Sequence, residues 1–333
     1  MKALVYNGPG KLAVEDKPKP QLQKPTDAII KLDYITICGT DLHILKGDVP
    51  TVEPGRILGH EGVGTVAEAG SGLSNFAPGD QVLISCISSC GACEYCRRGM
   101  NSHCTSGGWI LGNTIDGTQA EYVRIPLADG SLYKFPKEVD PKTLVMLSDI
   151  FPTGFECGVL NGKVQPGGTV AIVGAGPIGL AALLTAQFYS PAWVLMIDLD
   201  QNRLNVANQL GAAYGCNPNE AVDLVKKLTN GKGVDTVIEA VGVPESFEEC
   251  QDLVAPGGVI ANVGVHGVKA DLHLEKLWAA NIGDYPIRYS NEANSNYFTA
   301  ITTRLVDATT TPMLLKLLAA RKLPAEKMIT HRE

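Results

Sequence analysis

The sequence TVAIVGAGPIG, residues 169–179, is the most informative segment for the architecture of the C-terminal half of this chain. A run of β-prone apolar residues is followed by three glycines, Gly174, Gly176 and Gly179, in the spacing G-x-G-x-x-G. Such glycines allow a tight turn, close approach of the backbone to a pyrophosphate, and close helix–strand packing. Pro177 suits the first turn of a helix, whose free N–H groups can bind an anion. The stretch therefore predicts the strand, turn and helix of a dinucleotide-binding domain.

On both sides of this turn, apolar strands alternate with helical segments from about Gly168 to His266. The predicted strands are Thr169–Val173, Val194–Asp198, Val234–Glu239 and Val259–Val263, and the predicted helices are Ile178–Tyr189, Arg203–Leu210, Val222–Leu228 and Ser246–Val254. This alternation indicates βαβ units on a parallel sheet, an α/β fold of the doubly wound Rossmann type. A further helix is predicted at Pro312–Arg321.

Asp198 ends the strand that follows the glycine turn, 24 residues after Gly174. A carboxylate at this position can accept hydrogen bonds from both ribose hydroxyls, and it would repel a 2′-phosphate. The sequence therefore favours NAD over NADP.

The N-terminal half, from Lys2 to about Val145, is a succession of short β-like runs separated by Gly, Pro and Asp turns. Examples are Ala28–Tyr34, Gly62–Ala67 and Gln81–Ser85. This pattern predicts a β-rich, barrel-like domain.

Composition restricts the classes of protein and partner. A chain of 333 residues with 45% hydrophobic and 19% charged residues predicts a globular protein of two domains rather than a disordered one. A net charge of −7 without a basic run makes nucleic acid an unexpected partner. The N-terminus lacks the apolar segment of a secretory signal, and the apolar stretch Val170–Ala186 is interrupted by Gly and Pro, so a cytoplasmic protein without a membrane span is expected.

Nine cysteines, an odd count, point to thiols and metal ligands rather than disulfides. Four of them have the spacing C-x2-C-x2-C-x7-C: Cys90, Cys93, Cys96 and Cys104. Four thiolates satisfy tetrahedral Zn²⁺ with no open position, which predicts a structural zinc site. An iron–sulfur cluster also takes four thiolates, but the spacing differs from the bacterial ferredoxin run and no Pro follows the last Cys. Four further cysteines have no motif around them and are expected to pack in the core as small hydrophobic residues: Cys86, Cys157, Cys216 and Cys250.

Two glycine-rich segments lie upstream, CGTDLH at residues 38–43 and GHE at residues 59–61. Cys38 and His60 could ligate a second zinc ion, with one further ligand from elsewhere leaving the fourth position open. Taken alone, a lone Cys and a lone His are more often packing residues. Their combination with the other motifs favours the metal site.

Together, CGTDLH, GHE, the four-cysteine loop and the glycine turn resemble the zinc-dependent alcohol dehydrogenase family of medium-chain dehydrogenases, from about Lys2 to Val268. The resemblance implies a GroES-like catalytic domain at residues 1–152 with both zinc sites, a Rossmann domain at 153–290, and a return to the catalytic domain at 291–333. It also implies two zinc ions per chain, NAD, a small alcohol or ketone substrate, and a homo-oligomer, either dimer or tetramer.

The segment SDIFPTG, residues 148–154, resembles the bacterial secondary-alcohol dehydrogenase branch. This resemblance makes Asp149 the third ligand of the catalytic zinc. It implies that Glu61 either takes the fourth position when substrate is absent or acts from beside the metal. It also puts Trp109 at the wall of the substrate pocket, although a core position for this Trp is nearly as consistent with the sequence.

By the same resemblance, Thr40 and His43 belong to the family's proton relay, which runs from the substrate oxygen to Thr40, then to the cofactor ribose and then to His43. The alternatives are that Thr40 only caps a helix and that His43 is an ordinary surface residue. Asp41 is either the partner of the His60 ring or a turn residue. By resemblance, Thr153 approaches the nicotinamide, and the backbone at Val241 and Val263 to Val265 borders the cofactor. For the side chains of these valines, a position in the core of the sheet is the better prediction.

Two features depart from the family pattern. A polar, turn-rich segment, residues 283–300, separates KLWAANI from ITTRLVD, and relatives continue beyond the segment ITHR near residue 333. Three hypotheses of function therefore remain. The first is an NAD-dependent secondary-alcohol dehydrogenase, the second a polyol or amino-alcohol dehydrogenase of the same family, and the third an inactive protein that binds zinc and dinucleotide.

Overall fold

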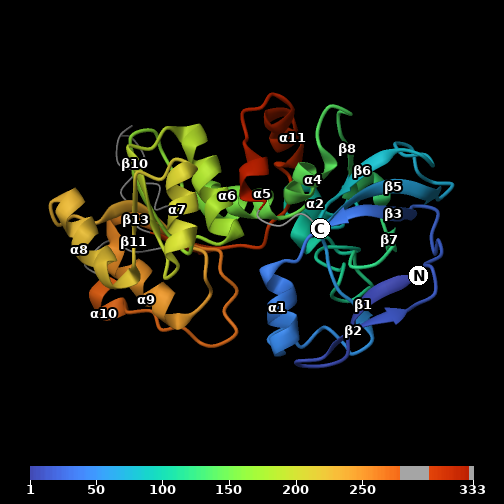
Figure 1. The fold of residues 1–333 in the computed structure, drawn as a ribbon, viewed down its shortest axis with the longest axis horizontal. Coiled ribbons are helices and arrows are strands. Elements are labelled where there is room, and N and C mark those ends of the chain that lie inside the picture. Colours follow the sequence, from blue (N-terminus) through green and yellow to red (C-terminus); the bar gives the residue numbers. More distant parts are fainter. Residues whose placement is uncertain (278–299, 330–333) are drawn as a thin grey trace. The chain divides into compact units, whose positions relative to one another are not determined.

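Six parallel strands and an antiparallel β-rich unit account for most of the regular structure in the computed structural model, which describes residues 1–277 and 300–329 (Figure 1). The chain divides into two compact units, Met1–Pro152 with Val306–Glu333, and Thr153–Leu305. The predicted α/β class with a β-rich first half is confirmed. The predicted return at residue 291 and nearly all of the unusual segment 283–300 lie outside the described residues, and the chain rejoins the first unit at Val306.

The second unit is built on a parallel sheet with the strand order β11-β10-β9-β12-β13-β14. Its strands are β9 (Thr169–Val173), β10 (Trp193–Ile197), β11 (Tyr214–Cys216), β12 (Val234–Glu239), β13 (Val254–Asn262) and β14 (Ala300–Thr303). In sequence terms this order is 3-2-1-4-5-6, that of the doubly wound dinucleotide-binding fold. The order reverses between β9 and β12, and in such sheets ligands bind at this point, outside the carboxyl ends of the strands.

Four predicted helices follow strands of this unit, with boundaries shifted by up to four residues. They are α6 (Pro177–Ala186) continued by η4 (Gln187–Tyr189), α7 (Gln201–Gln209), α8 (Pro218–Thr229) and α9 (Pro244–Leu253). Two further helices were not predicted, η3 (Gly154–Leu160, a π-helix), which precedes β9, and α10 (Leu274–Leu277). Asp200 and Asn217 cap α7 and α8, because each side chain accepts a hydrogen bond from a backbone N–H two residues on. Helix α6 is apolar nearly all round, since eight of its ten residues are buried.

The first unit contains a five-stranded antiparallel sheet of order β7-β3-β5-β6-β8 and a three-stranded sheet of order β2-β1-β4. The strands are β1 (Lys2–Tyr6), β2 (Leu12–Asp16), β3 (Ala28–Ile35), β4 (Arg56–Ile57), β5 (Gly62–Ala69), β6 (Gln81–Ile84), β7 (Tyr122–Ile125) and β8 (Leu132–Lys134). Strand β5 begins immediately after the GHE segment, and β6 ends two residues before Cys86. The start of β5 in the larger sheet therefore carries the GHE segment, whose His60 was predicted for the metal site.

Short helices complete the first unit. They are α1 (Gly39–Lys46), α2 (Glu94–Arg97), η1 (Asn101–His103), α3 (Ala128–Ser131), α4 (Pro141–Leu144), η2 (Val145–Leu147), α5 (Ile150–Thr153, whose last residue opens the second unit), α11 (Thr311–Ala319) and η6 (Ala325–Met328). The returning segment is held by polar contacts: buried Asp307 accepts from the backbone N and Oγ of Ser102 at 2.8 and 2.6 Å. The Tyr133 hydroxyl donates to the carbonyl of Ala308 at 3.0 Å.

By length and composition, the helical stretch Pro141–Leu160 is apolar enough to cross a membrane. However, 89% of its apolar window is buried inside the protein, as is common in core helices. The sequence analysis considered only Val170–Ala186 and expected it not to span, and it did not foresee the apolar stretch Pro141–Leu160. Val170–Ala186 combines strand β9 with most of the shorter apolar helix Pro177–Tyr189.

Candidate functional site

Four ionisable side chains predicted for the catalytic metal site come together in the first unit: Cys38, His60, Glu61 and Asp149. Their potential ligand atoms all lie within 4.8 Å of one another. Cys38 is the residue before α1, His60 and Glu61 directly precede β5, and Asp149 lies in the short turn between η2 and α5. Three elements far apart in sequence thus deliver one sulfur, one nitrogen and two carboxylates to a buried point.

The distances in this cluster come within a few tenths of an ångström of the edges of a zinc tetrahedron. His60 Nε2 lies 3.0 Å from Asp149 Oδ2, and Cys38 Sγ lies 3.9 Å from the same oxygen. Zinc bonds of about 2.0 to 2.3 Å imply separations of roughly 3.3 to 3.8 Å between tetrahedral ligand atoms. The donor set Cys, His and carboxylate is also one that zinc prefers. The residues therefore fit a zinc ion.

The electrostatics of the cluster are those of a site built around a cation. Burial, followed by the charge of Asp149, raises the pKa of Glu61 to about 7. Burial also raises the pKa of the Cys38 thiol. At His60, burial opposes the charged ring, but hydrogen bonds to Asp149 and Cys38 outweigh it and raise its pKa well above the usual value. A divalent cation would relieve this crowding of acidic groups.

One oxygen of Glu61 has no hydrogen-bond partner within the described chain, although it is buried. This Oε1 lies 3.9 Å from His60 Nε2, while Oε2 accepts from the Thr36 hydroxyl. An unpartnered buried carboxylate oxygen costs free energy unless a cation or donor occupies the space beside it. Glu61 therefore faces the metal position from a side that Cys38, His60 and Asp149 leave open.

The backbone turn that presents His60 requires glycine at position 59. Gly59 has φ +94°, and a Cβ atom there would come within 2.7 Å of both the Gln119 and Thr118 side chains. Both the conformation and the close packing therefore exclude larger residues.

Asp41 is a capping residue and not the partner of the His60 ring. Its Oδ2 accepts from the backbone N of Cys38 at 2.9 Å and from Gln119 Nε2 at 2.8 Å. No hydrogen bond joins Asp41 to His60 in the described structure. Of the two roles that the sequence left open, the structure supports the turn role, which fixes the Cys38 backbone at the start of α1.

The two predicted relay residues lie on the first turns of α1. Thr40 Oγ1 is 3.6 Å from Cys38 Sγ, next to the metal cluster. His43 Nδ1 is 2.9 Å from Asp48 Oδ2, and both side chains are partly exposed. Asp48 was not foreseen from the sequence; by holding Nδ1 it leaves Nε2 of His43 available for proton exchange.

Trp109 lies beside the metal cluster and also packs against the core, while its place at the wall of a substrate pocket stays a prediction. Its ring stands edge-on to His60, with centroids 6.3 Å apart and an interplanar angle of 76°. It also packs against an apolar cluster that includes Tyr6, Ile44 and Leu58. One face of the metal site is thus an apolar wall.

The four cysteines of the predicted structural site form a second cluster in the same unit, again with ligand atoms within 4.8 Å. Cys90 Sγ and Cys96 Sγ are 4.0 Å apart, close to the roughly 3.8 Å edge expected for four zinc–sulfur bonds of about 2.3 Å. Backbone N–H groups point at the sulfurs, and that of Cys96 lowers the pKa of Cys93 to about 6. Backbone N–H groups also lower the pKa of Cys90, so these contacts favour the thiolate form of Cys90 and Cys93, the form that binds metal, whereas burial raises the pKa of Cys96 to about 12. None of the nine cysteines, all of which lie in the described part of the chain, forms a disulfide.

The glycine turn of the second unit has the geometry that phosphate binding needs. Gly174 has φ +101°, and a Cβ on Gly179 would lie 1.8 Å from the Gly174 carbonyl oxygen. At Gly176, which caps α6, a Cβ would meet nothing within 4 Å. The first and third glycines are thus required by the turn and its packing, and the middle one leaves open space in front of the helix N-terminus.

Asp198 lies beside this turn, one residue beyond β10. Its Oδ2 accepts from Ala175 N at 2.7 Å, its Oδ1 accepts from Asp200 N at 2.8 Å, and Arg203 Nη1 is 3.8 Å away. The carboxylate is therefore fixed at the edge of the predicted cofactor site.

The three predicted valines follow β12 and β13. Val241 and Val265 are 42% and 47% exposed, and Val263 is half-buried. Their assignment as sheet core was wrong, because they lie in loops beyond the strand ends. Thr153, partly exposed, ends α5 at the start of the second unit.

Glu239, the last residue of β12, holds these loops and was missed from the sequence. It is fully buried, and its Oε1 accepts from Val241 N, Gly242 N and Ser246 Oγ at 2.7 to 2.9 Å. His266 Nε2 lies 3.5 Å from its other oxygen. A charged residue directly after the apolar run Val237–Ile238, at the end of the strand that pairs with the strand before the glycine turn, was the available signal.

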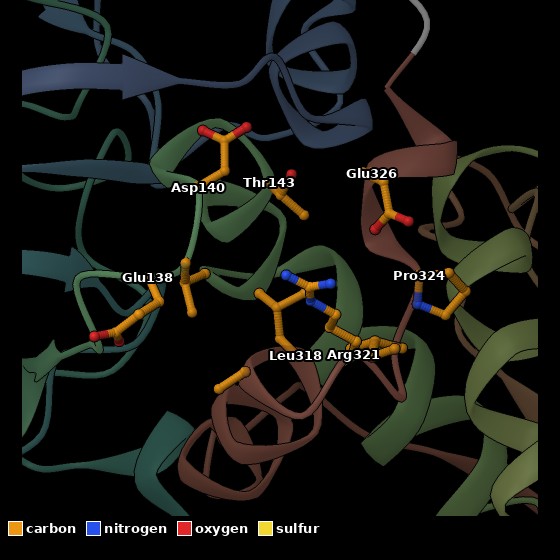
Figure 2. A pocket seen from close by; sticks show the side chains of 10 residues that line it. Glu138, Asp140, Thr143, Leu318, Arg321, Pro324 and Glu326 are labelled. Carbon is orange, nitrogen blue, oxygen red and sulfur yellow. The ribbon is translucent and has the colours of Figure 1, made fainter.

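A large pocket lies away from all these residues (Figure 2). It has a volume of about 590 Å³ and is lined by Glu138, Val139, Asp140, Thr143, Leu318, Ala319, Arg321, Leu323, Pro324 and Glu326. None of the predicted metal, catalytic or cofactor residues is among them. The volume of a pocket is therefore a poor guide to the location of the catalytic site in this chain.

Comparison with known proteins agrees with both halves of the structure. Residues 24–137 match the alcohol dehydrogenase GroES-like domain, and residues 177–302 match the zinc-binding dehydrogenase domain. The apo form of zinc dependent alcohol dehydrogenase 2 from Streptococcus pneumonia is 50% identical, with a TM-score of 0.91, over 99% of this chain and 90% of that one.

Two curated relatives extend the comparison. Zinc-type alcohol dehydrogenase B of Aspergillus flavus is 41% identical over 290 residues, and the match spans 84% of this chain but just under two thirds, 66%, of that protein. The NADP-dependent isopropanol dehydrogenase of Clostridium beijerinckii is 32% identical over 80% of this chain and 77% of its own length. With the two metal clusters and the glycine turn in place, these similarities show that the chain belongs to the zinc-dependent alcohol dehydrogenase family of medium-chain dehydrogenases.

Proposed function

We propose that this chain is an NAD-dependent alcohol dehydrogenase that oxidises a small secondary alcohol to a ketone. The observation that carries the proposal is the buried cluster of Cys38, His60 and Asp149, with the unpartnered oxygen of Glu61 beside it. A protein that only binds dinucleotide has no need of this second donor set. The hypothesis of an inactive binding protein is therefore the weaker one.

The charges of the cluster suit activation of a neutral alcohol. Zinc bound there supplies Lewis acidity, which favours loss of the hydroxyl proton. With Cys38 and Asp149 ionised and His60 neutral, the charges of these three residues and a divalent ion would sum to zero. These three residues by themselves would then leave no surplus negative charge to weaken the pull on the substrate oxygen.

The chain's own residues can remove that proton. Thr40 lies next to Cys38, and its hydroxyl can accept one proton while donating another. Asp48 orients the His43 ring through Nδ1 and leaves its Nε2 available for proton transfer. We assign Thr40 the relay of the proton and His43 its release to solvent.

The choice of a secondary alcohol rests on the SDIFPTG segment and on the name of the Clostridium relative. It is tested by following NADH absorbance with propan-2-ol, ethanol and a polyol at equal concentrations. We expect the highest kcat/KM with the secondary alcohol. Greater efficiency with the polyol would move the chain to the runner-up class, and no NAD or NADP reduction with any alcohol would contradict the proposal.

NAD is proposed because the Asp198 carboxylate is fixed beside the glycine turn. Asp198→Gly is expected to shift the ratio of kcat/KM for NADP over NAD upward by roughly thirtyfold, because it removes about 2 kcal/mol of repulsion against a 2′-phosphate. Arg203, 3.8 Å from that carboxylate, would then face the phosphate. The measurement is steady-state kinetics with both cofactors.

Asp200→Asn is the matched control, since it removes a neighbouring charge and keeps an N-cap acceptor for α7. It should leave the preference unchanged. If Asp198→Gly lowered kcat/KM equally for both cofactors, Asp198 would only brace the turn through Ala175 and Asp200.

A further inference from the structure

The two oxygens of Asp149 lie in different surroundings. Oδ2 is 3.0 Å from His60 Nε2 and 3.9 Å from Cys38 Sγ, inside the donor cluster. Oδ1 is 3.5 Å from the sulfur of Cys86. One oxygen therefore faces the metal position, and the other faces a buried thiol.

Cys86 is well placed to hold this carboxylate. It follows β6 by two residues and is 2% exposed. Its backbone N donates to the carbonyl of Ser148 at 3.2 Å, so a single residue contacts both the backbone before Asp149 and the Asp149 side chain. Burial confirms the sequence expectation for Cys86, but packing alone does not describe its role.

Ser148 connects the same turn to the other ligand segment. Its hydroxyl accepts from Gly62 N at 3.1 Å and donates to Gly62 O at 3.3 Å. Gly62 directly follows Glu61 at the start of β5. The turn that carries Asp149 is thus held between the end of β6 and the start of β5.

We propose that Cys86 is a positioning residue that donates its thiol hydrogen to Asp149 Oδ1 and keeps Asp149 a one-oxygen ligand of the catalytic zinc. A carboxylate left free can bind a metal through both oxygens, which would fill the coordination position that substrate needs. Partners behind the ligands orient them, and losing one typically weakens metal binding 10- to 100-fold. The inference rests on the proposed function only in requiring metal at this site.

Cys86 is not itself a fourth ligand. Among the described residues, the donor atoms of the catalytic cluster, which lie within 4.8 Å of one another, belong to Cys38, His60, Glu61 and Asp149. Cys86 is not a member of this cluster. Its sulfur contacts the Asp149 oxygen that is turned away from the cluster. The thiol therefore acts on the carboxylate and not on the metal.

The test uses the full-length protein carrying Cys86→Ala, Cys86→Val or Cys86→Ser. Alanine and valine both remove the donor, but alanine leaves a void that valine fills, so an effect common to both cannot come from the void. Serine keeps a donor. Cys250→Ala is the matched control, because Cys250 is a fully buried thiol in the apolar core of the second unit.

Two properties are measured: zinc affinity, by competition with a chelator, and the visible spectrum of Co²⁺-loaded protein. Tetrahedral Co²⁺ absorbs far more strongly than five-coordinate Co²⁺, so the spectrum reports how many ligand atoms Asp149 supplies. The spectrum of Cys38→Ala gives the contribution of the four-cysteine loop, which is subtracted.

We expect Cys86→Ala and Cys86→Val to bind zinc at this site roughly tenfold more weakly and to lose Co²⁺ band intensity. Cys86→Ser should recover most of both properties, and Cys250→Ala should match the wild type. If Cys86→Ala and Cys86→Val both kept the zinc affinity and the Co²⁺ spectrum of the wild type, the inference about Cys86 would be overturned, and the proposed function would stand. A wild-type Co²⁺ spectrum equal to that of Cys38→Ala would overturn the proposed function and the inference with it.

Discussion

Cys38→Ala protein is expected to lose turnover by roughly a thousandfold or more while it remains folded. The Lewis acidity at this site contributes several kcal/mol of stabilisation to the transition state, and each 1.36 kcal/mol is a factor of ten in rate. Cys38 is only partly buried, at the start of a short helix. Its sulfur therefore supports chemistry more than packing. The measurement is kcat/KM with the best alcohol, together with metal content.

Metal analysis and thermal melting make this result specific. Wild-type protein should hold two zinc ions per chain, and Cys38→Ala one, with a melting temperature within a few degrees of wild type. Asp149→Ala should give the same loss of turnover and of one zinc. Full turnover in Cys38→Ala protein would contradict the mechanism, whatever the melts show.

Local signals predicted most of the fold because each depends on neighbours in sequence. Strands β9 and β12 begin and end at the predicted residues, since each β-prone run directly follows a glycine, Gly168 or Gly233. The four-cysteine loop was readable from spacing alone, because one short segment supplies every ligand. Strand β11 was missed: it has three residues, and Tyr214 and Gly215 are exposed, so no apolar alternation marks it.

The features that could not be predicted depend on contacts between residues that are far apart in sequence. Cys86 and Asp149 are 63 positions apart, and no local pattern distinguishes Cys86 from a Cys that only packs. Asp48 and Glu239 were overlooked because a carboxylate next to a turn or at a strand end has many roles. The valines were misassigned for the opposite reason: apolar residues after a strand look like its continuation, whereas Val241 and Val265 lie in exposed loops.

Cys93→Ser should produce the opposite pattern to Cys38→Ala, with lower stability and turnover lost only as the protein unfolds. The segment from Cys90 to Cys104 has almost no apolar core, since neither α2 nor η1 contains a buried residue. Metal binding then supplies much of the free energy that orders the loop. The loop in turn anchors the returning C-terminal segment through Ser102 and Asp307.

Loss of this metal should cost about 2 to 5 kcal/mol, a fall of roughly 5 to 15 °C in the melting temperature of a unit of this size. Serine is close to cysteine in size, so a large fall reports the metal bond rather than a packing defect. Freshly purified Cys93→Ser should retain the second zinc and, below its melting temperature, near-normal kcat/KM. An unchanged melting temperature after loss of the loop zinc would show that the backbone N–H···S contacts and the Ser102–Asp307 contact hold the segment without metal. The four cysteines would then bind zinc without stabilising the fold.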